Sequence, residues 1–215
     1  MHSFGCGQSC LKHATQKSLI MNMEFWNESY RDDPGQTAVR DFFIEIEAAN
    51  LPLGAALDMG CGTGDILLNL AAKGWNVTGV DFAEEAIRLA RKSAVDRGLE
   101  ATFMVGDSTS WEAPRQYDLV FSTFAMPAGD DMSRVVANMA SALKPGGTLI
   151  ICEWDPKMSA IWGFSDDDLH SIEAYKMAMP GLKIEAAETR HVSAAFASDD
   201  QGAYVAFVRA TKPAF

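Results

Sequence analysis

The chain has 215 residues, of which 48% are apolar and 22% are charged; this composition fits a single globular domain and excludes a disordered chain. Its formal net charge of −11 makes DNA or RNA a poor ligand, because most of the surface would repel a polyanion. No apolar run approaches the roughly 20 residues of a membrane span, so we expect a soluble protein with no membrane partner.

The N-terminal segment lacks the compact apolar stretch of a secretion signal. We expect residues 1–20 to be a disordered tail and residues 21–215 to form a single domain. Four cysteines are divided between this tail and two predicted core elements: Cys6, Cys10, Cys61 and Cys152. This is no disulfide framework, and it indicates the reducing cytoplasm. The His and Cys spacing in the tail matches no common zinc site, so we expect no metal. The sequence does not indicate whether the protein is a monomer or an oligomer.

Apolar spacing predicts helices and strands that alternate along the chain. The expected elements, in order, are a helix over Pro34–Asn50, a strand over Ala55–Met59, a helix over Asp65–Lys73, a strand over Asn76–Val80, a helix over Glu84–Arg97, strands over Ala101–Val105 and Tyr117–Ser122, a helix over Met132–Leu143, a strand over Thr148–Glu153, a helix over Leu169–Met179, and strands over Lys183–Glu188 and Ala203–Ala210.

The strands up to residue 153 are apolar throughout, which is typical of a parallel sheet covered by helices on both faces. Only a loop separates the last two strands, so we expect them to be antiparallel. The predicted fold class is therefore α/β.

The sharpest motif is the segment 57–64, which reads Leu-Asp-Met-Gly-Cys-Gly-Thr-Gly between a predicted strand and a predicted helix. Glycines let the backbone turn tightly and let a ligand approach without interference from β-carbons. In open α/β sheets, nucleotides bind in the crevice beyond the carboxyl ends of the strands. The motif therefore predicts a ligand-binding loop.

Two acids follow the next two strands. Asp81 ends the second strand, where a carboxylate can accept both hydroxyls of a ribose. Asp107 ends the third strand, within reach of the exocyclic amine of an adenine. Each acid could also be an ordinary turn or cap residue, but ligand-type residues at successive strand ends favour a nucleoside site.

With these motifs the sequence resembles the class I S-adenosylmethionine-dependent methyltransferases, over roughly Glu24 to Lys212. Residues 24–30 loosely resemble the N-terminal helix of small-molecule members, the tellurite-resistance and thiopurine methyltransferase-like groups, in which it helps to close the donor site. Residues 117–122 and 143–149 are similar to the family's fourth strand and to the turn into its fifth. The resemblance implies a Rossmann-like seven-stranded sheet whose last strand is antiparallel, and S-adenosyl-L-methionine as cofactor. The cofactor-binding residues that we expect from it are Asp58, Gly60, Cys61, Gly62, Gly64, Asp81, Phe82, Asp107, Ser108 and Ser122.

Two alternatives stay open. A nicotinamide-dependent oxidoreductase also uses a glycine turn and an acid after its second strand, but its turn usually reads G-x-G-x-x-G. Here Gly60, Gly62 and Gly64 are spaced by two, and no Tyr-x-x-x-Lys pair occurs. A protein that binds the donor without turning it over would carry the same motifs.

The expected acceptor is a small molecule with a sulfur, oxygen or nitrogen nucleophile. Ser122 and the residues after it lack the Asn/Asp-Pro-Pro clamp typical of methyltransferases that act on amide or adenine nitrogen. The substrate-pocket residues that we expect are Trp26 and Tyr30 on an N-terminal helix, and Met126 and Trp154 after the fourth and fifth strands. Their apolar character favours a soft nucleophile such as a thiol, with core packing as the rival explanation.

A general base is needed only if the acceptor must lose a proton. The candidates are His170, His191, Asp155 and Tyr30, and none of them stands out in the sequence, so no catalytic residue is predicted.

Overall fold

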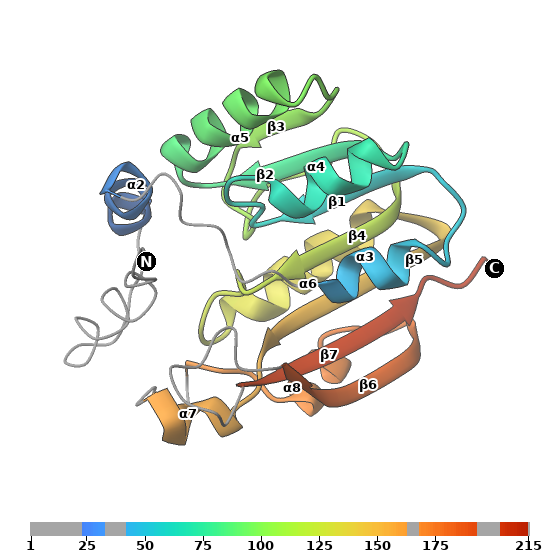
Figure 1. The fold of residues 1–215 in the computed structure, drawn as a ribbon. Helices are drawn as coiled ribbons and strands as arrows, with labels where there is room; N and C mark the ends of the chain where they lie inside the picture. Colours follow the sequence, from blue (N-terminus) through green and yellow to red (C-terminus); the bar gives the residue numbers. More distant parts are fainter. Residues whose placement is uncertain (1–22, 33–41, 163–167, 193–202, 215) are drawn as a thin grey trace.

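The computed structural model describes residues 23–32, 42–162, 168–192 and 203–214 (Figure 1). Its centre is one seven-stranded sheet of order β3-β2-β1-β4-β5-β7-β6. The strands are β1 Ala55–Met59, β2 Asn76–Asp81, β3 Thr102–Val105, β4 Tyr117–Thr123, β5 Leu143–Trp154, β6 Lys183–Val192 and β7 Ala203–Thr211. Strands β1 to β5 are parallel, and β7 runs antiparallel to both of its neighbours, β5 and β6. The predicted fold is therefore confirmed.

Helices cover both faces of this sheet (Figure 1). They are α2 Met23–Asp32, α3 Phe42–Ala48, α4 Asp65–Ala72, α5 Glu84–Asp96, α6 Asp131–Ala142, α7 Lys157–Trp162 and α8 Ile172–Met177. One core cluster joins α3, α4 and α5 to the first face, and a second joins α6 and α8 to the other. Within the described ranges, no helix is long and apolar enough to cross a membrane.

The centre of the sheet determines where a ligand can bind. From β1 the chain adds β2 and β3 on one side, then returns to place β4 on the other side of β1. At such a switch point the connections leave in opposite directions and open a crevice beyond the carboxyl ends of the strands. All five residues of β1 are buried, because a central parallel strand is covered on both faces.

Most boundaries lie within one residue of the predictions, and a few differ by more; one of these is the end of β6, which reaches Val192 rather than Glu188. Strand β5 begins at Leu143 rather than Thr148, because Leu143 already pairs with Tyr117 before the register shifts. Helix α8 begins at Ile172 rather than Leu169, where the Ser171 hydroxyl accepts the Ala174 N–H at 3.2 Å and caps the helix. Helix α7 was not predicted, and of the helix expected over Pro34–Asn50 the first eight positions lie outside the described residues.

Candidate functional site

The glycine turn after β1 lies at the carboxyl edge of the sheet, at the switch point. Gly60, Gly62 and Gly64 have φ angles of 89°, 50° and 78°, which residues with a β-carbon rarely adopt. The N–H groups of Gly60 and Cys61 donate to the Val80 carbonyl at 2.8 and 3.0 Å. The turn is thus fastened to the end of β2 by main-chain bonds.

The surroundings of these glycines leave no room for side chains. A β-carbon on Gly60 would overlap that of Ala125, and one on Gly62 would lie 2.9 Å from the Tyr30 hydroxyl oxygen. A β-carbon on Gly64 would lie 2.6 Å from the Phe103 ring. The prediction of a tight turn that needs glycine is confirmed in geometry.

Asp81 lies beside this turn and is 7% exposed. Its Oδ2 accepts the Gly62 N–H at 2.8 Å, and its Oδ1 accepts the Ala83 N–H at 2.9 Å. Burial raises the pKa of Asp81 above its usual value, and the two N–H donors limit that rise. The carboxylate is fixed in place while each oxygen keeps a second lone pair for a ligand.

Two further polar residues at this edge have a buried oxygen with no partner among the described residues. Asp58, at the end of β1, is 2% exposed and its Oδ1 is unpaired; Ser122, at the end of β4, has an unpaired hydroxyl. Burial, together with the negative charges of Asp81 and Glu153, raises the pKa of Asp58 well above its usual value. An unpaired buried carboxylate is costly and is typical of a functional site.

Asp107 and Ser108 follow β3 and hold a turn. The Asp107 Oδ1 accepts the Thr109 N–H at 2.8 Å and the Thr109 hydroxyl at 2.7 Å, and the Ser108 carbonyl accepts from the Asn138 side chain at 2.9 Å. The Asp107 side chain is exposed. Asp107 therefore stabilises the turn through Oδ1, and its Oδ2 remains available for the adenine contact that the sequence predicts.

Helix α2 covers the glycine turn. Its Asn27 Oδ1 accepts the Glu85 N–H at the start of α5, at 2.9 Å. Trp26 and Tyr30 share one face of α2, with ring centroids 5.9 Å apart, and the Tyr30 hydroxyl reaches Gly62. Tyr30, which the sequence analysis expects in the substrate pocket, therefore lies against the predicted donor loop.

The buried surroundings of Tyr30 and Cys61 determine the protonation of their side chains. Burial, with the nearby charge of Asp81, raises the pKa of Tyr30 above its usual value, so this phenol is no base near neutral pH. Burial likewise raises the pKa of the Cys61 thiol well above its usual value. A buried thiol of that kind is inert, and Cys61 acts as a small packing residue in the turn.

Aromatic and apolar side chains follow β4 and β5, where the acceptor was expected. The rings of Phe124 and Trp154 lie 4.3 Å apart between centroids, and both residues are half-buried. Met126 is half-buried next to them in sequence, and Phe82 is half-buried after β2. Phe124 and Glu153 were missed as site residues, although a single acid in the otherwise apolar residues 149–154 of β5 was a usable signal for Glu153.

The structure does not bring the other base candidates together. The His170 Nε2 lies 2.8 Å from the Pro127 carbonyl oxygen, and the His191 ring contacts Tyr204 edge-on. Asp155 is buried and accepts from the Lys157 N–H at 2.9 Å and the Thr189 hydroxyl at 2.6 Å. These bonds give Asp155 a structural role at the end of β5.

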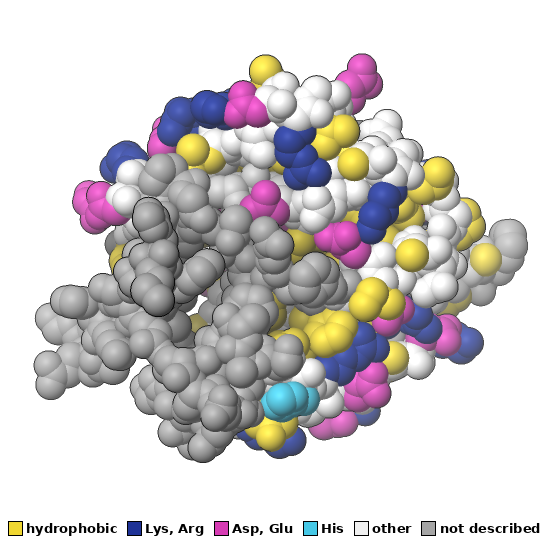
Figure 2. Space-filling view, viewed as in Figure 1, with side chains coloured by type: hydrophobic (Ala, Val, Ile, Leu, Met, Phe, Trp, Pro, Cys, Tyr) yellow, Lys and Arg dark blue, Asp and Glu magenta, His cyan; other side chains and the backbone are white. Residues whose placement is uncertain are grey.

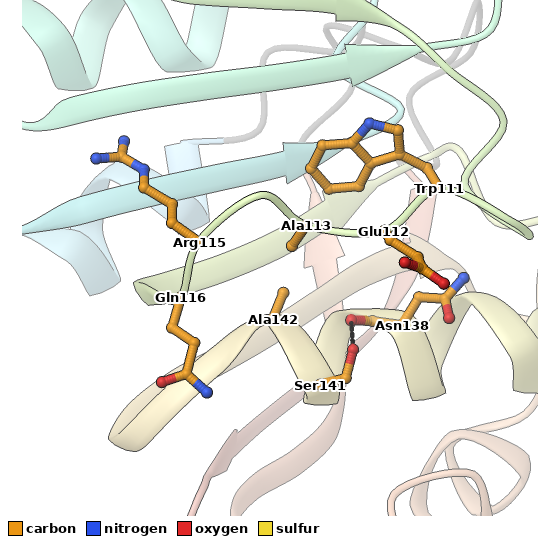
Figure 3. A pocket seen from close by; sticks show the side chains of 8 residues that line it. All are labelled: Trp111, Glu112, Ala113, Arg115, Gln116, Asn138, Ser141 and Ala142. Atoms are coloured by element: carbon orange, nitrogen blue, oxygen red, sulfur yellow. Dashed lines mark hydrogen bonds between the residues drawn. The ribbon is translucent and has the colours of Figure 1, made fainter.

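A separate groove of about 460 Å³ lies between the loop before β4 and helix α6 (Figure 3). Its lining includes Trp111, Arg115 and Asn138, and it runs toward Gln116 and Ala142, next to the amino ends of β4 and β5. The groove does not include the glycine turn, but it adjoins the predicted adenine end of the candidate site, because its lining residue Asn138 donates to the Ser108 carbonyl at 2.9 Å.

Comparisons with known proteins agree with this geometry. The family model described as "Methyltransferase domain" matches residues 56–147. The demethylmenaquinone methyltransferase of Thermus thermophilus is 34% identical over 110 residues, 50% of each chain. A ubiquinone biosynthesis O-methyltransferase of Bordetella pertussis is 33% identical over 107 residues, 49% of this chain and 44% of the relative. The chain thus matches about half the length of these curated relatives.

Solved structures extend the likeness to most of the chain. A structure described as "Conversion of a Disulfide Bond into a Thioacetal Group during Echinomycin Biosynthesis" has a TM-score of 0.73 and 25% identity, covering 89% of this chain and 92% of the other. TehB from Haemophilus influenzae has a TM-score of 0.67 and 18% identity, covering 87% of this chain and 67% of its own, and this shows a shared fold.

Proposed function

We propose, from the premise that this chain is a class I S-adenosylmethionine-dependent methyltransferase, that it transfers the methyl group of S-adenosyl-L-methionine to a small-molecule acceptor. The observation that supports this most is the convergence of the glycine turn, Asp81 and Asp58 at one edge of the sheet. The proposed donor site consists of the residues expected from the sequence: Asp58, Gly60, Cys61, Gly62, Gly64, Asp81, Phe82, Asp107, Ser108 and Ser122.

The site fits this donor chemically. The unpaired Asp58 Oδ1 is a buried acceptor for a cationic or N–H group of a ligand. The Asp81 carboxylate is held by Gly62 and Ala83 in a fixed orientation for hydroxyl donors. Gly60 and Gly62 hold the turn in the left-handed conformation that a ligand loop of this kind requires. Buried negative charge at this edge also suits a ligand that bears a sulfonium and an ammonium group.

When bound, S-adenosylmethionine supplies a methyl group that its sulfonium already activates. The residues of this chain therefore need to orient the two reactants and exclude water. Holding the two reacting groups in line can lower the activation free energy by up to about 7–11 kcal/mol. Tyr30 and the rest of α2 cover the glycine turn, and Phe124 and Trp154 give the adjacent surface an apolar character that disfavours water.

The same surface supports a soft or weakly polar acceptor. We propose that Trp26, Tyr30, Met126 and Trp154 line the acceptor side, and that the acceptor atom is a sulfur, oxygen or nitrogen of a small molecule. The likeness to ubiquinone biosynthesis O-methyltransferases supports oxygen, and the likeness to a protein that converts a disulfide into a thioacetal supports sulfur.

Nucleic acid is not proposed as a partner. The net charge is −11, and on the visible face Lys and Arg side chains are interspersed with Asp and Glu (Figure 2). Exposed ion pairs on α5, Arg88–Glu85 and Lys92–Asp96, belong to this pattern. The described part of this face therefore shows no extended basic patch that would match a phosphate backbone.

We also propose the cytoplasm as the compartment and a single domain over residues 21–215. Cys61 and Cys152 are both buried, and among the described residues neither is joined in a disulfide, in keeping with a reducing compartment. The predicted tail over residues 1–20 lies outside the described residues.

The test uses donor labelled with tritium in the methyl group. The full chain is incubated with separate fractions of RNA, protein and low-mass metabolites from a bacterial extract, and the label is followed chromatographically. We expect label in the low-mass fraction. Label found mainly in RNA or protein would contradict the proposal, and tight donor binding without label in any fraction would favour a non-catalytic binding protein. The chemical stability of the labelled product then shows whether the methyl group was transferred to a sulfur atom or to an oxygen or nitrogen atom of the acceptor.

A further inference from the structure

Glu153 is a buried acid at the carboxyl end of β5, and it is 6% exposed. Its Oε1 accepts two successive main-chain N–H groups from the turn after β4: that of Ala125 at 2.9 Å and that of Met126 at 3.2 Å. Successive N–H groups directed at one anion form a nest, a backbone arrangement with its own affinity for negative charge. Here the anion belongs to the protein itself.

The turn needs this support because of its conformation. Phe124 has a φ of 52° and is the one residue other than glycine with a positive φ among those that the structure describes. A bulky residue in the left-handed region is an outlier that persists only when its surroundings hold it there. The Glu153 carboxylate supplies two bonds immediately after the strained residue, and the Phe124 N–H donates to the Cys152 carbonyl at 3.1 Å.

The turn touches both halves of the candidate site. On one side Ala125 lies so close to Gly60 that a β-carbon there would overlap its own. On the other side the Phe124 ring lies 4.3 Å from the Trp154 ring. The conformation of residues 124–126 therefore determines how the apolar acceptor surface lies relative to the glycine turn.

We propose that Glu153 is a positioning residue for methyl transfer: by accepting the Ala125 and Met126 N–H groups, it holds Phe124 in the left-handed conformation that places its ring on Trp154 beside the glycine turn. This role rests on the proposed function for its consequence in catalysis, but its structural part can be tested without knowledge of the acceptor.

The experiment uses the full chain labelled with 5-fluorotryptophan, observed by fluorine NMR. The chain has five tryptophans, and the resonance of Trp154 is assigned with the variant Trp154→Phe. Glu153→Ala removes the acceptor, Glu153→Asp withdraws it by one methylene group, and Glu153→Gln keeps an acceptor oxygen at the same reach. The matched control is Asp118→Ala. Asp118 Oδ2 also accepts a main-chain N–H, that of Ala55 at 2.8 Å, but it does so at the amino ends of the strands, away from the candidate site.

We expect Glu153→Ala and Glu153→Asp to shift or broaden the Trp154 resonance, with Glu153→Gln restoring it to the wild-type position and Asp118→Ala leaving it in place. An unchanged Trp154 resonance in Glu153→Ala would overturn the proposal. A glutamine variant as perturbed as the alanine variant would overturn it too. If the alanine variant does not fold, Glu153→Asp provides the same comparison with the charge retained.

Binding of S-adenosylhomocysteine to the wild-type chain, measured by calorimetry, is the separate test of the proposed function. Absence of binding there would remove the catalytic consequence, whereas the resonance of Trp154 would still report on the turn. The two failures are therefore distinguishable.

Discussion

The glycine turn after β1 and the turn after β4 lie against each other, yet they solve the same problem differently. Both must reverse the chain at the carboxyl edge with positive φ angles. The first uses Gly60, Gly62 and Gly64, which adopt these angles without steric cost, and short main-chain bonds to Val80 hold it. The second uses Phe124 in a strained left-handed conformation. Glu153 on β5 stabilises it by accepting the N–H of Ala125, 28 residues earlier in the chain.

This contrast shows how a site can be divided between a fixed part and an adjustable part. A turn built from glycines tolerates almost no substitution, because added atoms meet backbone or packed side chains. A turn held by one side chain can be repositioned by changing that side chain. The proposed donor side thus has little freedom to vary, whereas the proposed acceptor side can change its shape with few substitutions.

The largest effect is expected at Gly60. Gly60→Ala places a β-carbon on that of Ala125 and forces alanine to a φ of 89°. Left-handed strain costs about 1–2 kcal/mol and overpacking adds about 1–3 kcal/mol. We expect a lower melting temperature and binding of S-adenosylhomocysteine weakened about 100-fold or more, measured by calorimetry.

The control is Gly98→Ala, since Gly98 has a φ of 61° but no atom within 4 Å of its added β-carbon. It should lose stability through backbone strain alone and keep its ligand affinity. Equal losses of affinity in the two variants would contradict a ligand loop at Gly60.

The second effect concerns Asp81. Asp81→Ala removes the carboxylate that we assign to the donor ribose, and charged hydrogen bonds contribute about 1.5–3 kcal/mol, so affinity for S-adenosylhomocysteine should fall about 10- to 100-fold. Asp118→Ala serves as control, because it also breaks a carboxylate bond to a main-chain N–H but at the amino edge. Unchanged affinity in Asp81→Ala would rule out the ribose role.

The third prediction concerns Asp58, and it asks whether this buried acid lowers the free energy of unfolding. Its folded pKa is raised well above the usual value by burial, so the ionised side chain destabilises the folded state near neutral pH. Removing the charge with Asp58→Asn should stabilise the fold on the order of 1–3 kcal/mol and weaken ligand binding. The melting temperature should rise by about 2–4 °C for each kcal/mol.

The pH dependence has a definite sign. The penalty is fully present above the raised folded pKa and is absent below the ordinary value near about 3.9. The difference in melting temperature between Asp58→Asn and wild type should therefore shrink as pH falls through this window. A difference that grows on acidification would mean that Asp58 is stabilised by a partner rather than held at a cost.

The smallest effect is expected at Asp107, on the exposed rim. Asp107→Asn keeps the Oδ1 that accepts from Thr109, so the turn should survive. Loss of one acceptor for the adenine amine should weaken S-adenosylhomocysteine about 2- to 10-fold. The analogue with inosine in place of adenosine lacks that amine, and the variant should bind both compounds equally. Persistent discrimination would place the adenine elsewhere.

The same contrast between the two turns explains which parts of the fold and of the candidate site could be predicted from the sequence. The first turn is local: strand, glycines and helix are adjacent in the chain, and β1 was predicted with the bounds that the structure has. The position of Asp81 follows from the rule that parallel strands end at one edge.

The second turn could not be predicted, because its conformation depends on Glu153, and no residue within it signals a left-handed phenylalanine. The contact of Tyr30 with Gly62 was missed for the same reason, since it depends on how α2 docks. Helix α8 was predicted too long because its apolar spacing extends past the Ser171 cap.

The bond between Asn27 and Glu85 has one more consequence. The first turn of α5 has no side-chain cap of its own, so the Glu85 amide depends on an acceptor 58 residues away in α2. Hydrogen–deuterium exchange at this single amide should therefore measure how often α2 leaves the glycine turn. Its protection should fall in Asn27→Ala and rise when S-adenosylhomocysteine binds at the glycine turn, so that one backbone proton reports the opening of the whole N-terminal helix.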